Sequence, residues 1–195
     1  MTRTRAFLVL ALLTITTLVD ASDNPKVKFT TSYGDFIVEL YPEKAPISVQ
    51  NFLSYVSSKR YKDAHFYRVV TQKNQPDNEI KIEVVQGGLG WDPHPDRQAS
   101  IKHEPTNQTG IKHTNGTISM ARLEPGSADA EFFFCIGEQP ELDYGGKRNP
   151  DGKGFAAFGK IIDGINTLQT IHQLKSKKQL LVNTVPIQIE LVHNQ

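Results

Sequence analysis

The chain has 195 residues, enough for one domain with a sizeable core and too few for two. It carries 22 Lys and Arg against 21 Asp and Glu, a formal net charge of +1, so its charge favours neither nucleic acid nor anionic lipid as a partner. The single cysteine, Cys135, excludes a disulfide within the chain, and its place in the run EFFFCIG predicts a buried, unreactive thiol.

The first 21 residues differ from the rest of the chain. Two arginines precede an uncharged apolar run, 6–19, which is followed by short residues at the positions that a signal peptidase recognises. The run is short for a membrane span. We therefore predict a signal peptide, 1–21, cleaved after Ala21, and one exported domain, 22–195, with a net charge of 0. The domain would be periplasmic in a Gram-negative host and secreted otherwise.

The next elements follow from hydrophobic periodicity. Alternating runs at 27–31 and 36–40 flank a Ser-Tyr-Gly-Asp turn and predict an antiparallel hairpin. Pro46 begins an amphipathic stretch of about three helical turns, and a second helix is predicted over about 165–174. Further strands are predicted at 65–70, about 80–86, 117–121, 131–136, 155–161 and 185–192.

Many short strands with only two helices favour an all-β barrel or sandwich whose open ends the helices cover. The stretch 89–116 lacks a regular pattern and is predicted to be a long loop packed around the site. The strand at 65–70, HFYRVV, carries Arg68 among aromatic and β-branched residues. On this local pattern alone, Arg68 would be an ordinary edge residue with its head in water, and Phe133 an ordinary core residue.

Six segments of the chain stand together in the order and approximate spacing of one family. They are TSYGDFIVELYPEKAPISVQNFLSYV, HFYRVV, VVQGG, GTISMAR, EFFFCIG and FAAFGKIIDG. Each is weak alone, but their order makes the chain resemble a cyclophilin-type peptidyl-prolyl cis-trans isomerase over about residues 27–192. The resemblance implies a mainly β fold, an eight-stranded antiparallel closed β-barrel capped by two α-helices.

The resemblance also implies a function and a site. Such a protein binds a peptide around proline in a surface groove and accelerates rotation about the Xaa-Pro bond, which assists the folding of unfolded or flexible chains. It uses no cofactor and no metal, and we expect a monomer without nucleic-acid or membrane partners. Arg68 corresponds to the catalytic arginine. The substrate-binding residues carried over are Phe133, Gln86, Val84, Met120, Ala121, Arg122, Glu131, Leu142 and Phe155.

The segment before Gln86 departs from the family pattern. The stretch TQKNQPDNEIKIE, 71–83, is about ten residues longer than the usual connection and is predicted to be a longer hairpin at the groove rim. Counting back from Gln86 puts Glu83 where the family usually has a phenylalanine of the proline pocket. Ile82 takes that place if the register slips by one.

Four further residues depart from the family pattern. Glu131 replaces a glutamine, Arg122 an asparagine, Glu141 a tryptophan and Phe155 a histidine. Without the tryptophan we expect weak or no ciclosporin binding. We expect Glu131 to pair with Arg68 and preorganise it, with Arg122 as a second possible partner; the alternative is that Glu131 occupies donors that the substrate needs. The departures at residues 83, 122, 131 and 141 also keep open a non-catalytic proline-peptide-binding chaperone or scaffold module.

Other chemistries have weaker signals. The six histidines show no helical i,i+4 pair and no cysteine partner, so no metal site is predicted. A Ser-His-Asp hydrolase would need a nucleophile turn such as Gly-x-Ser-x-Gly, which the sequence lacks.

Overall fold

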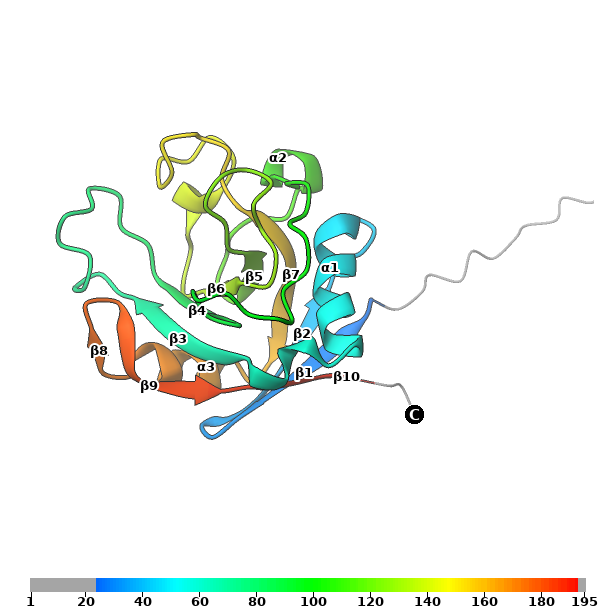
Figure 1. Ribbon diagram of the computed structural model, residues 1–195. Coiled ribbons are helices and arrows are strands. Elements are labelled where there is room, and N and C mark those ends of the chain that lie inside the picture. Colours follow the sequence, from blue (N-terminus) through cyan, green and yellow to red (C-terminus); the bar gives the residue numbers. More distant parts are fainter. Residues whose placement is uncertain (1–23, 193–195) are drawn as a thin grey trace, which may run out of the picture.

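The computed structural model describes residues 24–192, so the predicted signal peptide lies outside the described residues. One antiparallel sheet runs through this part of the chain in the order β10-β1-β2-β7-β5-β6-β4-β3-β9-β8 (Figure 1). Its strands are β1 (Lys26–Thr31), β2 (Gly34–Leu40), β3 (His65–Val70), β4 (Val84–Gly88), β5 (Thr117–Met120), β6 (Phe132–Cys135), β7 (Ala156–Asp163), β8 (Ser176–Lys177), β9 (Leu180–Pro186) and β10 (Gln188–Leu191). The helices are α1 (Pro46–Ser57), α2 (Thr106–Thr109) and α3 (Ile165–His172), with 3-10 turns η1 (Arg60–Asp63) and η2 (Pro140–Leu142).

The C-terminal stretch of the described chain brings the two ends of the sheet together. β9 pairs with β3 and β10 pairs with β1, and only Ile187 separates the two strands. Ile187 N continues the contact by donating to Ala64 O at 2.9 Å. The hydrogen-bonded ladder itself ends at β10 and β8 and is not closed strand to strand.

The predicted antiparallel β fold with two main helices is confirmed, and its details differ. Ten strands are distinguished among residues 24–192 because the predicted last strand is split at Ile187 and β8 adds a two-residue pair. The short helix α2 lies inside the predicted long loop. The strand predicted from about residue 80 starts only at Val84. No helix of the described part is long and apolar enough to cross a membrane.

The core lies inside the curved sheet and is rich in phenylalanine. Phe29 and Phe36 stack at 4.8 Å, and Phe134 meets both rings edge-on at 5.4 Å. Phe52 of α1 and Leu168 of α3 join the same buried cluster, so both helices close the core. The start of α1 is capped from the long loop, because Glu104 accepts hydrogen bonds from Ile47 N and Ser48 N at 3.0 and 2.7 Å.

Strand alternation creates a second apolar cluster outside the core. On β6, Phe132 and Phe134 face the core, whereas Phe133 and Cys135 face the other side. We call this outer group the outer cluster; it consists of Val70, Ile82, Val84, Phe133, Cys135 and Leu142. It positions the functional site.

Candidate active site

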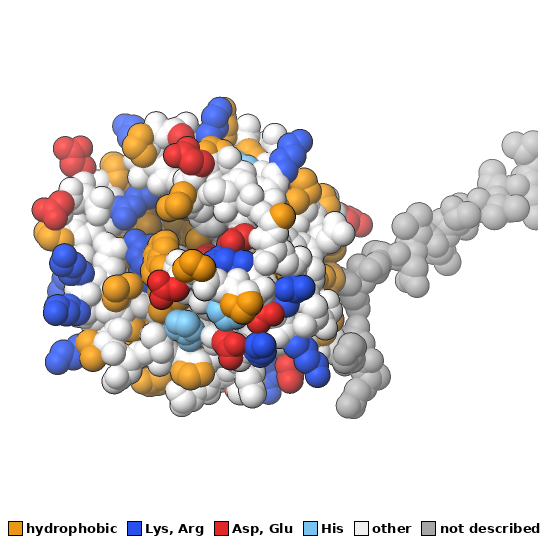
Figure 2. Space-filling view, viewed as in Figure 1, with side chains coloured by type: hydrophobic (Ala, Val, Ile, Leu, Met, Phe, Trp, Pro, Cys, Tyr) orange, Lys and Arg blue, Asp and Glu red, His pale blue; other side chains and the backbone are white. Residues whose placement is uncertain are grey.

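A hollow of about 520 Å³ lies over the outer cluster. Figure 2 shows it as a recess with hydrophobic side chains inside and Lys or Arg side chains beside it. Its lining includes nine of the ten sequence-predicted residues: Arg68, Val84, Gln86, Ala121, Arg122, Glu131, Phe133, Leu142 and Phe155.

Phe133 forms an apolar surface in this hollow and is only 4% exposed. Phe155 meets it edge-on at 5.2 Å, and the His113 ring stacks on it at 5.9 Å with an interplanar angle of 14°. His113 is fixed in turn by Asp143 Oδ1, 2.8 Å from its Nδ1. Phe133 is therefore a rigid surface, suited in size and polarity to a small apolar ring such as that of proline.

Arg68 is aimed at the hollow by a β-bulge. In the pairing of β3 with β4, Phe66 opposes Gly87 and Arg68 opposes Gln86, so Tyr67 is the extra residue of the bulge. Arg68 Nη1 donates to Gln86 Oε1 at 2.7 Å, and Nε donates to Gln179 Oε1 at 3.0 Å, as does Nη2. These bonds use three of the five guanidinium N–H groups, which leaves two without a partner among residues 24–192. Burial lowers the pKa of Arg68 from its ordinary value.

Gln86 connects Arg68 to a buried carboxylate. Gln86 Nε2 donates to the Tyr67 hydroxyl at 2.7 Å, and this hydroxyl donates to Glu131 Oε2 at 2.7 Å. Glu131 Oε1 accepts from Arg97 Nη2 at 2.9 Å and from Leu89 N at 3.0 Å. Burial raises the pKa of Glu131 to about 7, against the lowering effect of Tyr67 and Arg97.

The predicted pairing of Glu131 with Arg68 is wrong. Glu131 pairs with Arg97 instead, and Arg68 is held by two neutral amides. Arg122 does not share Glu131 either, because its guanidinium pairs with Asp151 at 2.7 Å and donates to Gly154 O. The bulge explains the difference, since it places Tyr67 between the carboxylate and the Gln86 amide.

The structure differs from the predicted site at Met120, and it decides between the two registers left open for the insertion. Met120 does not line the hollow; it alternates with Ala121 along the chain and is fully buried in the core. Ile82, rather than Glu83, lies in the outer cluster, so the register of the long insertion is the slipped one. Glu141 lies outside the hollow, where its carboxylate accepts from Lys147 N.

Sequence reasoning missed four residues around Arg68 and the hollow. Trp91 and Arg97 come from the long loop, Arg148 from the segment after η2, and Gln179 from the turn before β9. Trp91 is the only tryptophan and follows the Gly-Gly pair, which is a usable signal. Gln179 lies 111 residues from Arg68 and has no local signal.

A second hollow of about 790 Å³ adjoins the first and shares Arg68 and Trp91 with it. It lies between the insertion 71–83 and the β8–β9 turn, which are on the same side of the molecule in Figure 1. Trp91 is 58% exposed and its ring meets Tyr67 at 5.7 Å. A peptide bound across the first hollow could therefore extend over a continuous surface into the second hollow.

A Ser-His-Asp arrangement is present but closed to substrate. Asp143 Oδ1 lies 2.8 Å from His113 Nδ1, and His113 Nε2 lies 3.0 Å from Ser119 Oγ. The Ser119 residue is 0% exposed, so its hydroxyl cannot reach a substrate carbonyl. The arrangement supports Phe133 structurally.

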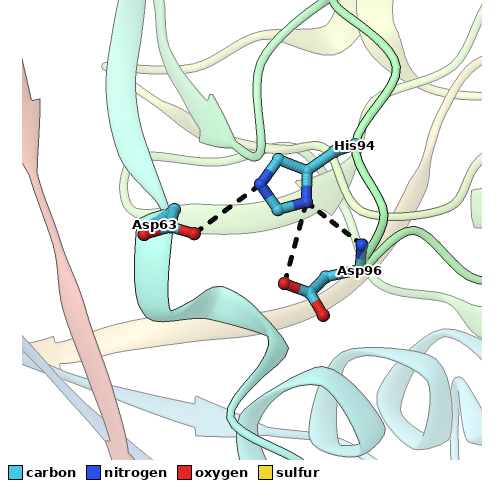
Figure 3. Close-up of side chains that lie close together, drawn as sticks. All are labelled: Asp63, His94 and Asp96. Carbon is cyan, nitrogen blue, oxygen red and sulfur yellow. Dashed lines mark hydrogen bonds and ion pairs between the residues drawn. The ribbon is translucent and has the colours of Figure 1, made fainter.

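A histidine-carboxylate cluster lies elsewhere on the surface. Figure 3 shows His94 between Asp63 and Asp96, at 3.7 Å from Asp63 Oδ2 and 3.9 Å from Asp96 Oδ2. These three groups offer ligand atoms within 4.8 Å of one another, a grouping that spacing along the chain did not indicate. Lys62 Nζ lies 3.3 Å from Asp96 Oδ2 and Arg60 Nη1 lies 3.9 Å from Oδ1. Lys62 and Arg60 therefore balance the negative charge of Asp96.

Comparison with known proteins agrees with this geometry. A family model described as "Cyclophilin type peptidyl-prolyl cis-trans isomerase/CLD" matches residues 26–193. Peptidyl-prolyl cis-trans isomerase B of Escherichia coli (strain K12) is 31% identical over 175 residues, which cover 83% of this chain and 98% of that protein. Peptidyl-prolyl cis-trans isomerase A of Dickeya dadantii (strain 3937) is 33% identical over 182 residues, covering 91% and 87%.

Solved structures show the same fold. A cyclophilin type peptidyl-prolyl cis-trans isomerase of Cryptosporidium parvum has a TM-score of 0.68 at 23% identity, covering 88% of this chain and 99% of that one. The same isomerase in the presence of the dipeptide Ala-Pro gives a TM-score of 0.68 at 24% identity. With the match over 26–193, these findings show that the chain belongs to the family of cyclophilin-type peptidyl-prolyl cis-trans isomerases.

Proposed function

We propose that the protein accelerates rotation about Xaa-Pro bonds in flexible or unfolded chains and that Arg68 is its catalytic residue. The observation that carries this proposal is a guanidinium with two available N–H groups beside an apolar hollow that contains Phe133. The proline ring would lie on Phe133. The chain on either side of it would run along the hollow.

Arg68 suits the electronic change in this reaction. Rotation about a peptide bond meets a barrier of about 18–20 kcal/mol because the nitrogen lone pair is delocalised into the carbonyl. In the twisted transition state this lone pair is localised on nitrogen. A fixed cationic donor directed at the proline nitrogen, or at the proline carbonyl, stabilises the twisted state more than either planar state, which is the requirement for catalysis.

Arg68 cannot supply the whole effect. A ten-thousandfold acceleration requires about 5.5 kcal/mol, whereas one charged hydrogen bond contributes about 1.5–3 kcal/mol. The remainder must come from desolvation and positioning on the outer cluster. The two amides that hold Arg68 add to this, because they fix its planar group before the substrate binds.

The rival function, a binding module without turnover, is suggested by the departures from the family pattern at residues 83, 122, 131 and 141. Of these, Glu131 and Arg122 line the hollow. Each of these residues has its charge partner away from Arg68, in Arg97 and Asp151. This arrangement favours catalysis over the rival.

Export and partners complete the proposal. The apolar segment of residues 1–21 supports an exported protein, periplasmic in a Gram-negative host, that acts on proline segments of other chains as a monomer. Glu141 stands where the family often has a tryptophan and lies outside the hollow, which supports weak or no ciclosporin binding.

The test compares cis-trans exchange in a short Ala-Pro peptide, followed by exchange spectroscopy, for the wild type, Arg68→Ala and Arg68→Lys. We expect the wild type to accelerate exchange and both variants to lose most of it, because lysine lacks the planar fork that the two amides hold. Peptide binding measured in parallel should persist. Binding by the wild type without any acceleration would instead establish the rival function.

A further inference from the structure

The side chains between Arg68 and Glu131 form a chain of hydrogen bonds with a defined direction. Arg68 can only donate, so the Gln86 amide must turn its oxygen toward Arg68 and its nitrogen toward Tyr67. The Tyr67 hydroxyl accepts from Gln86 and gives its one proton to Glu131. The direction is therefore consistent only if Glu131 Oε2 accepts a proton, as an ionised carboxylate does.

Protonation of Glu131 would reverse this direction. Oε1 already accepts from Arg97 and Leu89 N, so a proton on Glu131 can only be accommodated on Oε2, 2.7 Å from the Tyr67 hydroxyl. Tyr67 would then have to turn its own proton toward Gln86. The Gln86 amide could accept it only by rotating, which would place its NH₂ against Arg68, donor against donor.

We propose that Glu131, through Tyr67, is a positioning residue that sets the orientation of the Gln86 amide and thereby holds Arg68 ready for the substrate. With Glu131 ionised, Gln86 accepts from Arg68 and fixes it. With Glu131 protonated, this support is lost. The proposal rests on the proposed function, and it makes the isomerase activity depend on one buried proton.

The surroundings of Glu131 permit such a proton. Gly88 lies so close that a Cβ there would meet Glu131 Oε2 at 2.5 Å, so β4 leaves room for the carboxylate only because residue 88 is glycine. The charged and titratable groups that face it are Arg97 and Asp129 from the loops, Tyr67 from β3 and Tyr61 from η1. Burial outweighs the stabilising bonds and raises the pKa of Glu131 to about 7, which is within reach of ordinary buffers.

The experiment measures kcat/KM for an Ala-Pro peptide without titratable side chains from pH 5.5 to 8.5, in the wild type and in Glu131→Gln. In the wild type we expect kcat/KM to fall about tenfold as pH drops through about 7, the effect of losing one polar contact of about 1.4 kcal/mol. The amide introduced in Glu131→Gln would turn its oxygen to Arg97 and its NH₂ to Tyr67, so it donates to Tyr67 as the protonated acid does. We therefore expect this variant to show the low value at every pH.

Two matched controls exclude other origins of the pH effect. The ring centroids of His65 and Tyr67 are 5.6 Å apart, which makes His65→Gln the control for a neighbouring imidazole, and this variant should keep the inflection. Glu104 is a second buried glutamate, in contact with α1, and Glu104→Gln should also keep it. Tyr67→Phe breaks the chain and leaves Glu131 in place, although Oε2 loses the hydrogen bond from the hydroxyl. This variant should abolish the inflection, which gives an independent test if Glu131→Gln folds poorly.

The outcomes separate this proposal from the proposed function. A wild type that accelerates exchange without an inflection near pH 7, or an inflection that survives in Glu131→Gln or Tyr67→Phe, would overturn the positioning role and leave the isomerase function intact. A wild type that accelerates exchange at no pH would overturn the function itself.

Discussion

The guanidinium of Arg68 is held from two sides by side-chain amides, Gln86 on β4 and Gln179 in the turn before β9. Neutral amides fix its geometry without neutralising its charge. A carboxylate in direct contact with Arg68 would bind the guanidinium more strongly. It would also offset the positive charge that the substrate is meant to experience. Gln86 and Tyr67 separate Glu131 from Arg68, so the positive charge of Arg68 remains available for the reaction.

Gln179 gives a direct test of this support. Replacing it with alanine should lower kcat about tenfold with little change in KM, because Arg68 loses the acceptor of Nε and Nη2 and becomes mobile. Steady-state kinetics on an Ala-Pro peptide checks this, with exposed Gln188→Ala on β10 as the control. A rise in KM at unchanged kcat would show instead that Gln179 acts in binding.

At the scale of elements, strand periodicity explains what the sequence predicts well. Alternation on β6 and β4 separates core residues such as Phe134 and Val85 from hollow-lining residues such as Phe133 and Val84, so most of the hollow follows from pattern and family resemblance. The bulge at Tyr67 does not follow, because an extra residue in a pair depends on the partner strand. The wrong pairing of Glu131 is a direct consequence of this missing residue.

The insertion 71–83 is the element that sequence reasoning placed least well, and one buried side chain organises it. Gln75 Nε2 donates to Thr71 O and Ile82 O, and Arg148 Nη1 donates to Gln75 Oε1 at 3.0 Å. Ile82 and Arg148 both line the first hollow. The insertion thus holds part of the substrate surface in place. Ile82 remains in the outer cluster although β4 begins only at Val84.

We expect Gln75→Ala to raise KM several-fold and to leave kcat nearly unchanged. The variant frees Ile82 and Arg148 at the rim, while the contacts of Arg68 with Gln86 and Gln179 remain. Amide hydrogen exchange at residue 82 should be faster, since the side-chain oxygen that Ile82 N contacts is removed. Glu79→Ala, at an exposed residue of the same insertion that lines neither hollow, is the control. A fall in kcat at constant KM would place Gln75 in the support of Arg68.

At the scale of the whole molecule, the same sheet has a core on one face and the outer cluster with its hollow on the other. The core holds most of the large apolar side chains and both main helices, so stability does not depend on the hollow remaining tightly packed. The charged groups Arg68, Arg97 and Glu131 all lie on the hollow side. Groups of this kind lower stability when buried and are retained where the chemistry needs them.

At Glu131, the cost in stability of burying a charged group can be measured. Burial raises its pKa from the ordinary 4.5 to about 7, so the folded state binds a proton more tightly than the unfolded state between these values. The resulting stabilisation is fully present below pH 4.5 and is lost as pH rises through 7, an amount of about 3 kcal/mol. His113 acts in the opposite direction, because burial lowers its pKa from 6.5. The folded state therefore loses stability at His113 as pH falls.

Urea unfolding of the wild type and Glu131→Gln at a series of pH values from 5 to 8 separates the two effects, since His113 is common to both proteins. We expect the free energy of unfolding of the wild type to fall relative to the variant as pH rises across this range. A constant difference would mean that Glu131 titrates at its ordinary value in the fold. With the expected result, the pH that ionises Glu131 and orders Arg68 is also the pH at which the fold is less stable, so the protein loses stability where it gains activity.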